Sequence, residues 1–303
     1  MTLPRATGNV GRLILQALQN AQPSFESITV LTRSANASSS TIPTPAPNIL
    51  TRVVDYSSQG SLLDAFQGVD AVVSAIATQS VGLQIGIIDA AVEAGVKFFI
   101  PSEFGLANTH LKLRRDFPIF EDKIAIQDHL ERLSQSHGIS YALVFVGLFL
   151  DWGMDGFVID VRNKKVGFWD DGERPVSMTT MASIGKAVMG VLEGKVKGKK
   201  EVRVKDINIS QKRLYELAAE VVGRDGWEVK TIDTAQAAVI ASEKLAKGTA
   251  DLDDIYAFVY RASTGEEYGQ PWRPEEDDSE SLGLRPWTEN DVKDLITDTF
   301  LLK

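Results

Sequence analysis

The sequence contains no cysteine, so it can form no disulfide, thiolate nucleophile or zinc–thiolate site. It also lacks a long apolar run. The most apolar segment, Tyr141 to Leu150, is half as long as the roughly 20 residues that a membrane-spanning helix needs. The N-terminus has no basic segment followed by an apolar one, so no secretory signal is predicted and the expected location is cytoplasmic. These absences indicate an ordinary soluble globular protein without a membrane partner.

Positive charge is also scarce. The chain has 32 Lys and Arg against 41 Asp and Glu, a net charge of −9, which disfavours a nucleic-acid partner. The three histidines, His110, His129 and His137, are not spaced as ligands of one metal ion, so no metal is expected, and His129 is expected at the surface. No Gly-x-Ser-x-Gly elbow is present, which argues against an esterase. The expected partner is therefore a small-molecule substrate, and the oligomeric state stays open.

The first half of the chain alternates short β-branched runs with longer helical stretches, which is typical of βαβ units around a parallel sheet. Strands are predicted at 28–32, 49–54, 71–75, 98–100 and 141–146. Helices are predicted at 11–20, 61–67, 79–94 and 120–136. The expected fold class is α/β, a Rossmann-type doubly wound parallel sheet.

The second half has a different rhythm and predicts a smaller α+β portion. Strands are predicted at 164–169 and 201–204, and helices at 181–192, 211–222, 235–247 and 289–301. We therefore expect an NAD(P)-binding domain over 1–150 and a substrate-binding portion over 151–303, packed against the first. The acidic run from Glu275 to Glu280 is interpreted as a solvated surface loop.

The segment Thr7-Gly8-Asn9-Val10-Gly11 leads directly into a helical pattern. Glycines three apart at a helix start let backbone N–H groups approach a pyrophosphate, and the helix N-terminus attracts its charge. Arg33 follows the next predicted strand, where an acidic residue would bind the ribose of NAD and an arginine suits the 2′-phosphate of NADP. The pattern favours NADP(H). The alternative is that Arg33 is a plain surface residue at a strand end.

These motifs carry a resemblance to a known family. The sequence resembles the NmrA-like and isoflavone-reductase-like branch of the atypical short-chain dehydrogenases, in order and spacing along nearly the whole chain. The matching segments are Thr7 to Gly11, Leu31-Thr32-Arg33, Phe99-Ile100-Pro101-Ser102-Glu103-Phe104-Gly105, Lys123 with Leu130-Glu131, and Leu284 to Thr288. The resemblance implies an NADP(H)-dependent reductase that moves a hydride between nicotinamide and a small aromatic or conjugated substrate.

The chain departs from the family pattern at its start. Arg5 stands where the first glycine of the loop is expected, and only four residues precede it. Because proline lacks the ladder N–H, Leu3-Pro4 is not expected to supply a strand, which leaves an unfilled slot beside the second strand. A side chain at Arg5 is also expected to crowd the turn and weaken NADP(H) binding. Alternatively, the Arg5 guanidinium pairs with the pyrophosphate.

Lys123 lies on the predicted helix 120–136. In short-chain dehydrogenases a Tyr-x-x-x-Lys pair on this helix transfers the proton and the lysine holds the nicotinamide ribose; here Ile119 stands at the tyrosine position. The resemblance implies that Lys123 is both the general acid/base and a cofactor-binding residue. The alternative is an exposed lysine paired with Glu121 or Asp122 on the helix surface.

Further candidates follow other predicted strands, at the edge where open α/β sheets bind ligands. Phe104 is expected to shape the nicotinamide and substrate side of the crevice. Thr78 and Gln79 are placed to touch the cofactor, unless Thr78 or Ser80 caps a helix instead. Phe149 and Trp152 are expected to line the substrate pocket, although core packing is an equal alternative for Phe149.

Three functions are consistent with these patterns. The first is an NADP(H)-dependent reductase. The second is a catalytically silent NmrA-like regulator that senses a dinucleotide or binds a protein partner. The third is a family member that uses the pocket for non-redox chemistry.

Overall fold

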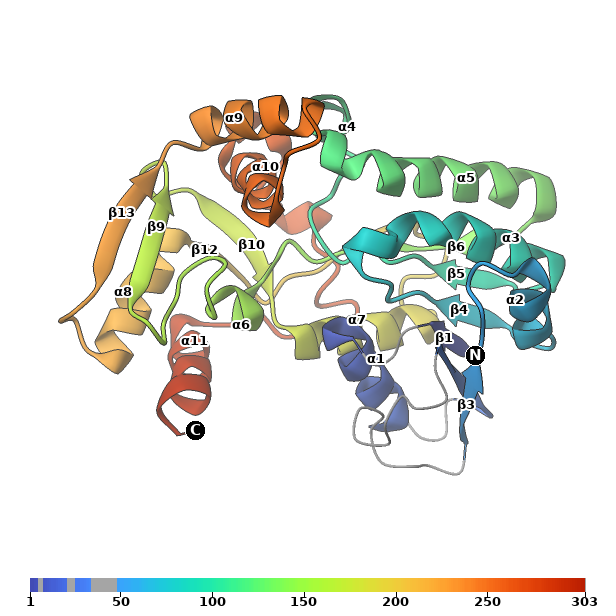
Figure 1. Cartoon of the computed structure of the whole chain (residues 1–303). Coiled ribbons are helices and arrows are strands. Elements are labelled where there is room, and N and C mark those ends of the chain that lie inside the picture. The colour runs from blue at the N-terminus through green and yellow to red at the C-terminus, as the bar shows by residue number, and fades with distance from the viewer. Residues whose placement is uncertain (5–7, 21–24, 34–47, 303) are drawn as a thin grey trace.

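The computed structural model describes residues 1–4, 8–20, 25–33 and 48–302. A parallel sheet in the order β3-β2-β1-β4-β5-β6 forms the first half of the molecule (Figure 1). Its strands are β1 (Thr2–Pro4), β2 (Ile28–Thr32), β3 (Ile49–Val53), β4 (Ala71–Val73), β5 (Phe98–Ile100) and β6 (Ser140–Tyr141). This is the strand order of a Rossmann fold, so the expected fold class is confirmed.

Helices cover both faces of the sheet, because successive residues of each strand face opposite sides. Val73 and Ile100 face one apolar core with α1 (Asn9–Asn20) and α7 (Met181–Leu192). Val72 and Phe99 face the other core, with α2 (Gln59–Phe66), α3 (Gln84–Glu93) and α5 (Glu121–His137). Burial on both faces explains why these strands are apolar throughout.

The slot beside β2 is filled by a strand of three residues, so the expectation of an unfilled slot there is wrong. Thr2, Leu3 and Pro4 pair with Thr29, Val30 and Leu31, and Thr2 also pairs with Val72 of β4. Pro4 is the last residue of this short strand, and its carbonyl accepts a hydrogen bond from the Ala75 amide at 3.2 Å. Pro4, which has no amide hydrogen, therefore joins the hydrogen bonding of the sheet edge through its carbonyl. Arg5 lies outside the described residues, so its effect on the turn stays an expectation.

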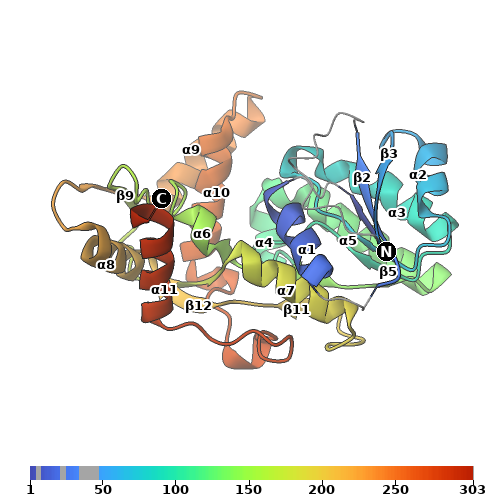
Figure 2. The ribbon, with the colours of Figure 1, turned by 90° about the horizontal axis from the view of Figure 1, so that it is seen from below.

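The rest of the chain forms smaller sheets and a group of helices (Figure 2). β7 (Leu143–Phe145) pairs with β11 (Glu201–Arg203), β10 (Pro175–Thr179) lies between β8 (Leu148–Phe149) and β12 (Ile207–Ser210), and β9 (Lys165–Trp169) pairs with β13 (Glu228–Ile232). The helices are α4 (Leu111–Asp116), α6 (Leu150–Gly153), α8 (Gln211–Val222), α9 (Thr234–Ala246), α10 (Leu252–Thr264) and α11 (Glu289–Ile296), with a 3₁₀ helix at 78–83 and single turns at 118–120, 266–268, 274–276 and 297–301.

α7 belongs to the second half of the sequence but packs against α1 of the first. Ile184 and Val188 of α7 share one core with Ile14 and Leu15 of α1. The contact is close at Gly185, where a Cβ would lie 2.6 Å from the backbone oxygen of Leu13. Residues on both sides of position 150 thus share a core, and the division into two domains there stays a prediction.

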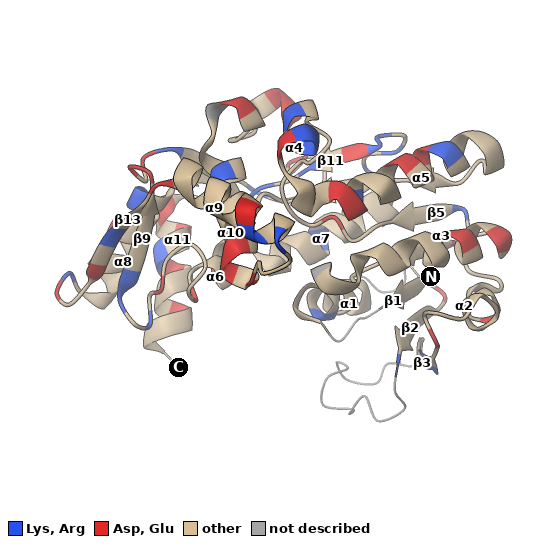
Figure 3. Ribbon diagram, turned by 45° about the horizontal axis from the view of Figure 1, so that its top comes forward, with Lys and Arg blue, Asp and Glu red and all other residues tan. Residues whose placement is uncertain are grey.

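The acidic run at 275–280 is docked on the protein, so its interpretation as a solvated loop is wrong. Glu276 pairs with Arg203 at 2.5 Å, Asp277 pairs with Lys205, and Asp278 pairs with Lys199. Asp278 and Ser279 are buried. Acidic and basic residues occur over both halves of the ribbon (Figure 3), and here a basic segment around β11 neutralises the run. Among the described residues, no helix is long and apolar enough to cross a bilayer.

Candidate functional site

The helix start at the carboxyl edge of the sheet has the features that a dinucleotide needs. α1 begins at Asn9, after β1, and the Arg12 amide donates to the Gly8 carbonyl at 2.9 Å. Gly11 is buried, Asn9 is exposed and Val10 packs against the core. The first turn of α1 carries no acidic side chain, so nothing on it opposes an anion. Thr7 lies outside the described residues.

Arg33 stands at the same edge. It follows the last residue of β2 and is exposed, and it forms no ion pair with any described residue. The edge lies where the strand order reverses between β1 and β4, which is where open α/β sheets bind ligands. An exposed guanidinium at the same edge as a helix start without acidic residues fits a phosphorylated dinucleotide.

The turn after β5 crosses the carboxyl edge and is held from both sides. The Ser102 amide donates to Gln84 Oε1 at 2.8 Å, and the Ser102 hydroxyl donates to the Ile76 carbonyl at 2.8 Å. The Phe104 amide donates to the Val144 carbonyl at 3.0 Å. Phe104 has a φ of +34°, which non-glycine residues seldom adopt and which costs free energy that the surrounding contacts must offset.

Lys123 reaches this turn from α5. Its ammonium donates to the Glu103 carbonyl at 2.5 Å and lies 3.7 Å from Glu103 Oε2, and the lysine side chain is 18% exposed. It forms no ion pair with Glu121 or Asp122, so the alternative of an exposed surface pair is wrong. The reason is the phase of the helix, which turns Lys123 toward the sheet while those two acids face solvent.

A buried polar network surrounds the Glu103 carboxylate. Gln127 Nε2 donates to Glu103 Oε1 at 2.9 Å and to Asn108 Oδ1 at 2.6 Å, and Asn108 Nδ2 donates to Glu103 Oε2 at 3.3 Å. Burial raises the pKa of Glu103, while Lys123 and the two amides oppose that rise. The network fixes the carboxylate beside the lysine and leaves the ammonium at the partly open edge.

The sequence did not single out Asn108, Gln127 or Gln84. One signal was available for Gln127, which stands four residues after Lys123 and therefore on the same helix face. Another was available for Gln84, a polar residue within an apolar stretch. Asn108 lies in an irregular segment and carries no such signal.

Gln79 is exposed in the 3₁₀ helix Thr78–Leu83, and of Thr78 only the backbone is described. The cap of that helix is Ala77, and the cap of α3 is Leu83, so the alternative that Thr78 or Ser80 caps a helix is wrong. The segment 78–83 instead forms a 3₁₀ helix of its own between β4 and α3. Contact of Thr78 and Gln79 with a cofactor stays a prediction.

The three aromatic candidates separate into two groups. Phe104 is buried in the core that contains Ile100 and Val144. Phe149 and Trp152 have ring centroids 6.2 Å apart, and Trp152 is 36% exposed. Only Phe149 and Trp152 thus present ring surface together, while Phe149 also packs against the core. Their contact with substrate stays a prediction.

His129 is less exposed than expected. Its Nε2 lies 2.6 Å from Asp89 Oδ1, and its side chain is 14% exposed, so the expectation of a surface residue is wrong. A carboxylate on the neighbouring α3 holds the ring against the protein. Within the described part of the chain, no group of His, Asp and Glu lies close enough together to hold a metal ion.

The sheet order, the helix start at its carboxyl edge and the lysine on α5 define a Rossmann-type α/β protein. A model of the NmrA-like family matches residues 2–225, and the chain belongs to that family. The expected resemblance is thereby confirmed.

Relatives and solved structures agree with this assignment. Oxidoreductase poxI of Penicillium oxalicum is 32% identical over 235 residues, which cover 76% of this chain and 72% of poxI. Oxidoreductase aprR of Aspergillus flavus is 28% identical over 246 residues, which cover 80% of each chain. The structure of AtPrR2 with NADP+ and (+)pinoresinol matches with a TM-score of 0.75 at 18% identity and covers 98% of this chain and 97% of its own. The binary complex of leucoanthocyanidin reductase with NADPH from Vitis vinifera matches with a TM-score of 0.73 at 16% identity, covering 98% and 99%. These two structures share the fold and hold NADP(H).

Proposed function

We propose that this protein is an NADP(H)-dependent reductase of a small aromatic or conjugated substrate. The observation that carries the proposal is the position of Lys123, whose ammonium is held by the Glu103 carbonyl at the sheet edge where dinucleotides bind. The relatives named as oxidoreductases and the NADP(H) complexes of the same fold support it.

The residues that would hold the cofactor are Gly8 to Gly11 for the pyrophosphate and Arg33 for the 2′-phosphate. Thr78, Gln79 and Lys123 would contact its nicotinamide half. NADPH bound there supplies a hydride to the substrate.

The protein's own part in the reaction is proton transfer and orientation. When negative charge gathers on a substrate oxygen or carbon, the Lys123 ammonium donates a proton to that atom. Glu103 positions the ammonium, because its carbonyl accepts a hydrogen bond from it. Phe149 and Trp152 offer ring surface on which an aromatic substrate packs.

The test compares Lys123→Met with the matched control Lys112→Met, a lysine on α4. The purified proteins are titrated with NADPH and NADH by calorimetry, and NADPH oxidation is followed with a panel of phenols and quinones. We expect turnover to fall by roughly 100-fold or more in Lys123→Met alone, with NADPH still bound. Unchanged turnover would exclude proton transfer by Lys123. Binding of NADPH without turnover of any substrate by the natural chain would favour the silent regulator instead.

A further inference from the structure

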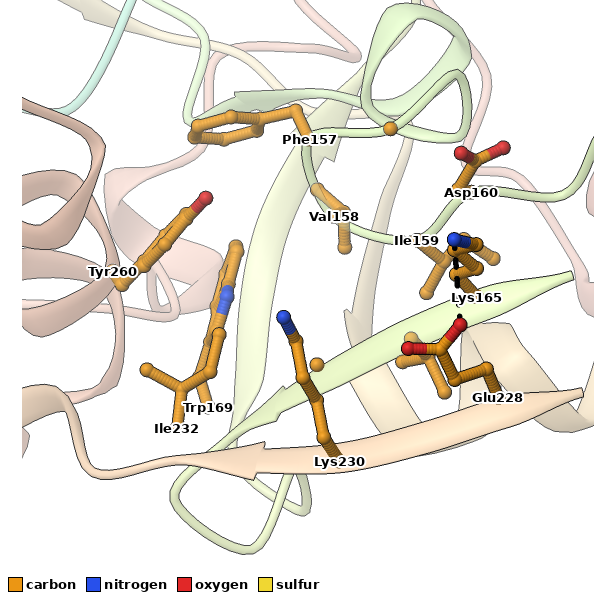
Figure 4. A pocket seen from close by; sticks show the side chains of 13 residues that line it. Phe157, Val158, Ile159, Asp160, Lys165, Trp169, Glu228, Lys230, Ile232 and Tyr260 are labelled. Atoms are coloured by element: carbon orange, nitrogen blue, oxygen red, sulfur yellow. Dashed lines mark ion pairs between the residues drawn. The ribbon is translucent and has the colours of Figure 1, made fainter. Parts of the chain in front are cut away.

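A cavity of about 280 Å³ opens between β9, β13 and the turn at 156–160, with α10 on one side (Figure 4). None of the residues assigned above to cofactor, proton transfer or substrate lines it. Its volume is close to the lower end of the range, about 300 Å³, that is common for small-ligand sites. The cavity can therefore take one small molecule.

Aromatic rings form one wall of the cavity. Trp169 is almost fully buried and stacks on Tyr260, with ring centroids 4.6 Å apart and an angle of 24°. The Phe157 ring lies across both, 6.0 Å from Trp169 and 5.5 Å from Tyr260. Such a wall favours a flat ring over a flexible chain.

The side chain of Lys230 lies against Gly167 of β9, on one side of the cavity. A Cβ at Gly167 would lie 3.3 Å from Lys230 Cε and 2.8 Å from Ile232 Cδ1, so the glycine gives both side chains room to lie on β9. The Lys230 ammonium then points into the cavity (Figure 4). A larger residue than glycine would displace this lysine stem.

Of the other charged residues of the lining, two form an ion pair and the third is hydrogen-bonded to a neutral residue. Lys165 pairs with Glu228 at 3.3 Å, and Asp160 accepts from the Asn163 amide at 3.0 Å and from Asn163 Nδ2 at 2.8 Å. Lys230 has no carboxylate partner among the described residues. The lining thus holds two cations and two carboxylates, and Lys230 is the cation among them that lacks a carboxylate partner in the described part of the chain.

Two further groups can donate a hydrogen bond to a ligand: the Trp169 indole, which can only donate, and the Tyr260 hydroxyl, which can also accept. The indole N–H of Trp169 turns toward the same space as Lys230, and in the described part of the chain no oxygen accepts from it (Figure 4). The Tyr260 hydroxyl also lacks a partner there. Burial raises the pKa of Tyr260 to about 12, so this hydroxyl keeps its proton at neutral pH. Lys230, Trp169 and Tyr260 can therefore each donate a hydrogen bond to an acceptor on a ligand.

We propose that this cavity binds a small planar aromatic carboxylate, with its ring on Trp169 and Phe157 and its carboxylate on Lys230. A carboxylate satisfies the ammonium by a charge-assisted hydrogen bond, and the ring replaces water on the aromatic wall. This site uses none of the proposed cofactor residues and needs no nicotinamide, and it adjoins the proposed substrate surface, because Phe157 stacks on Trp152 with ring centroids 5.3 Å apart.

The experiment titrates the full chain with 2-naphthoate and with its uncharged amide, 2-naphthamide, by calorimetry. The variants are Lys230→Met, Lys230→Arg and the control Lys197→Met, an exposed lysine elsewhere that loses the same charge. We expect naphthoate to bind the natural chain at least about tenfold more tightly than the amide, because only naphthoate meets the charge. Lys230→Met should abolish that preference, Lys230→Arg should keep it and Lys197→Met should leave it unchanged.

Equal affinity of the natural chain for acid and amide would overturn the proposal. So would equal binding by Lys230→Met and Lys197→Met, or no binding of naphthoate up to about 10 mM. Because Lys230 is exposed, its variants should fold, and a thermal melt by circular dichroism checks this. Since the titration contains no NADPH, failure here leaves the reductase proposal untouched, and the converse also holds.

Discussion

Replacement of glycine by alanine can be compared at two helical sites, one in the contact between α1 and α7 and one outside it. The expected effects on the free energy of unfolding are opposite. Gly185 and Gly86 both lie within helices, α7 and α3. Replacing a helical glycine by alanine ordinarily stabilises a protein by about 0.5–1 kcal/mol, because the unfolded chain loses freedom. A Cβ at Gly86 meets no atom within 4 Å, so Gly86→Ala should show that full gain.

Gly185→Ala should instead destabilise the protein. Its Cβ would lie 2.6 Å from the Leu13 oxygen and 3.2 Å from the Ala17 Cβ, whereas ordinary contact begins at 3.4 Å. The two helices must therefore separate by 3.4 − 2.6, or roughly 0.8 Å, along a buried contact that Ile14 and Val188 fill. Overpacking of this kind costs about 1–3 kcal/mol, which exceeds the helix gain. The net expectation is a loss of about 1–2 kcal/mol.

Urea unfolding followed by circular dichroism measures both variants against the natural chain. The expected difference between them, about 1.5–3 kcal/mol, is well above the error of the method. If Gly185→Ala proved as stable as Gly86→Ala, α1 and α7 would not be packed as closely as described, and the account of this face of the sheet would be refuted.

Two other variants test the edge of the sheet. Because burial raises the pKa of Glu103, the folded protein holds that proton more tightly than the unfolded chain, and the free energy of unfolding should fall as pH rises above about 4.3. Glu103→Gln has no carboxyl proton to lose at this position. In urea unfolding, its free energy of unfolding relative to that of the natural chain should therefore rise between pH 4.5 and pH 7. A difference between the two proteins that does not change with pH would contradict the argument. Arg33→Ser should weaken NADPH binding by roughly tenfold or more in calorimetry while NADH binding changes little, since only NADPH offers a 2′-phosphate. Equal weakening of both dinucleotides would show that Arg33 does not read that phosphate.

Elements with strong local patterns could be predicted from the sequence to the residue. The apolar strands β2 and β5 and the amphipathic helices α7 and α8 have the predicted bounds. β13 was missed, because Glu228–Ile232 is charged and largely exposed and becomes a strand only through its pairing with β9. α10 was missed although Asp251 and Asp254 form a capping box at its start, a signal that the sequence does contain.

The candidate site was predictable where its residues belong to local sequence motifs. Gly8, Gly11 and Arg33 follow local motifs, and Lys123 followed from the family resemblance. The partners of Lys123 depend on how the turn after β5 meets α5, which brings Glu103 within 3.7 Å of it across 20 positions of sequence. No local pattern encodes that distance.

The packing of α7 on α1 also determines when the sheet edge is completed during synthesis. The apolar face of α1, with Ile14, Leu15 and Leu18, leaves the ribosome long before α7, which covers it. A nascent chain that has already made every strand of the parallel sheet still has this face open to solvent, and such exposed apolar surface is where chaperones bind and aggregation begins. The helix whose start is proposed to bind the dinucleotide thus gains its cover by α7 only after Leu192 has emerged.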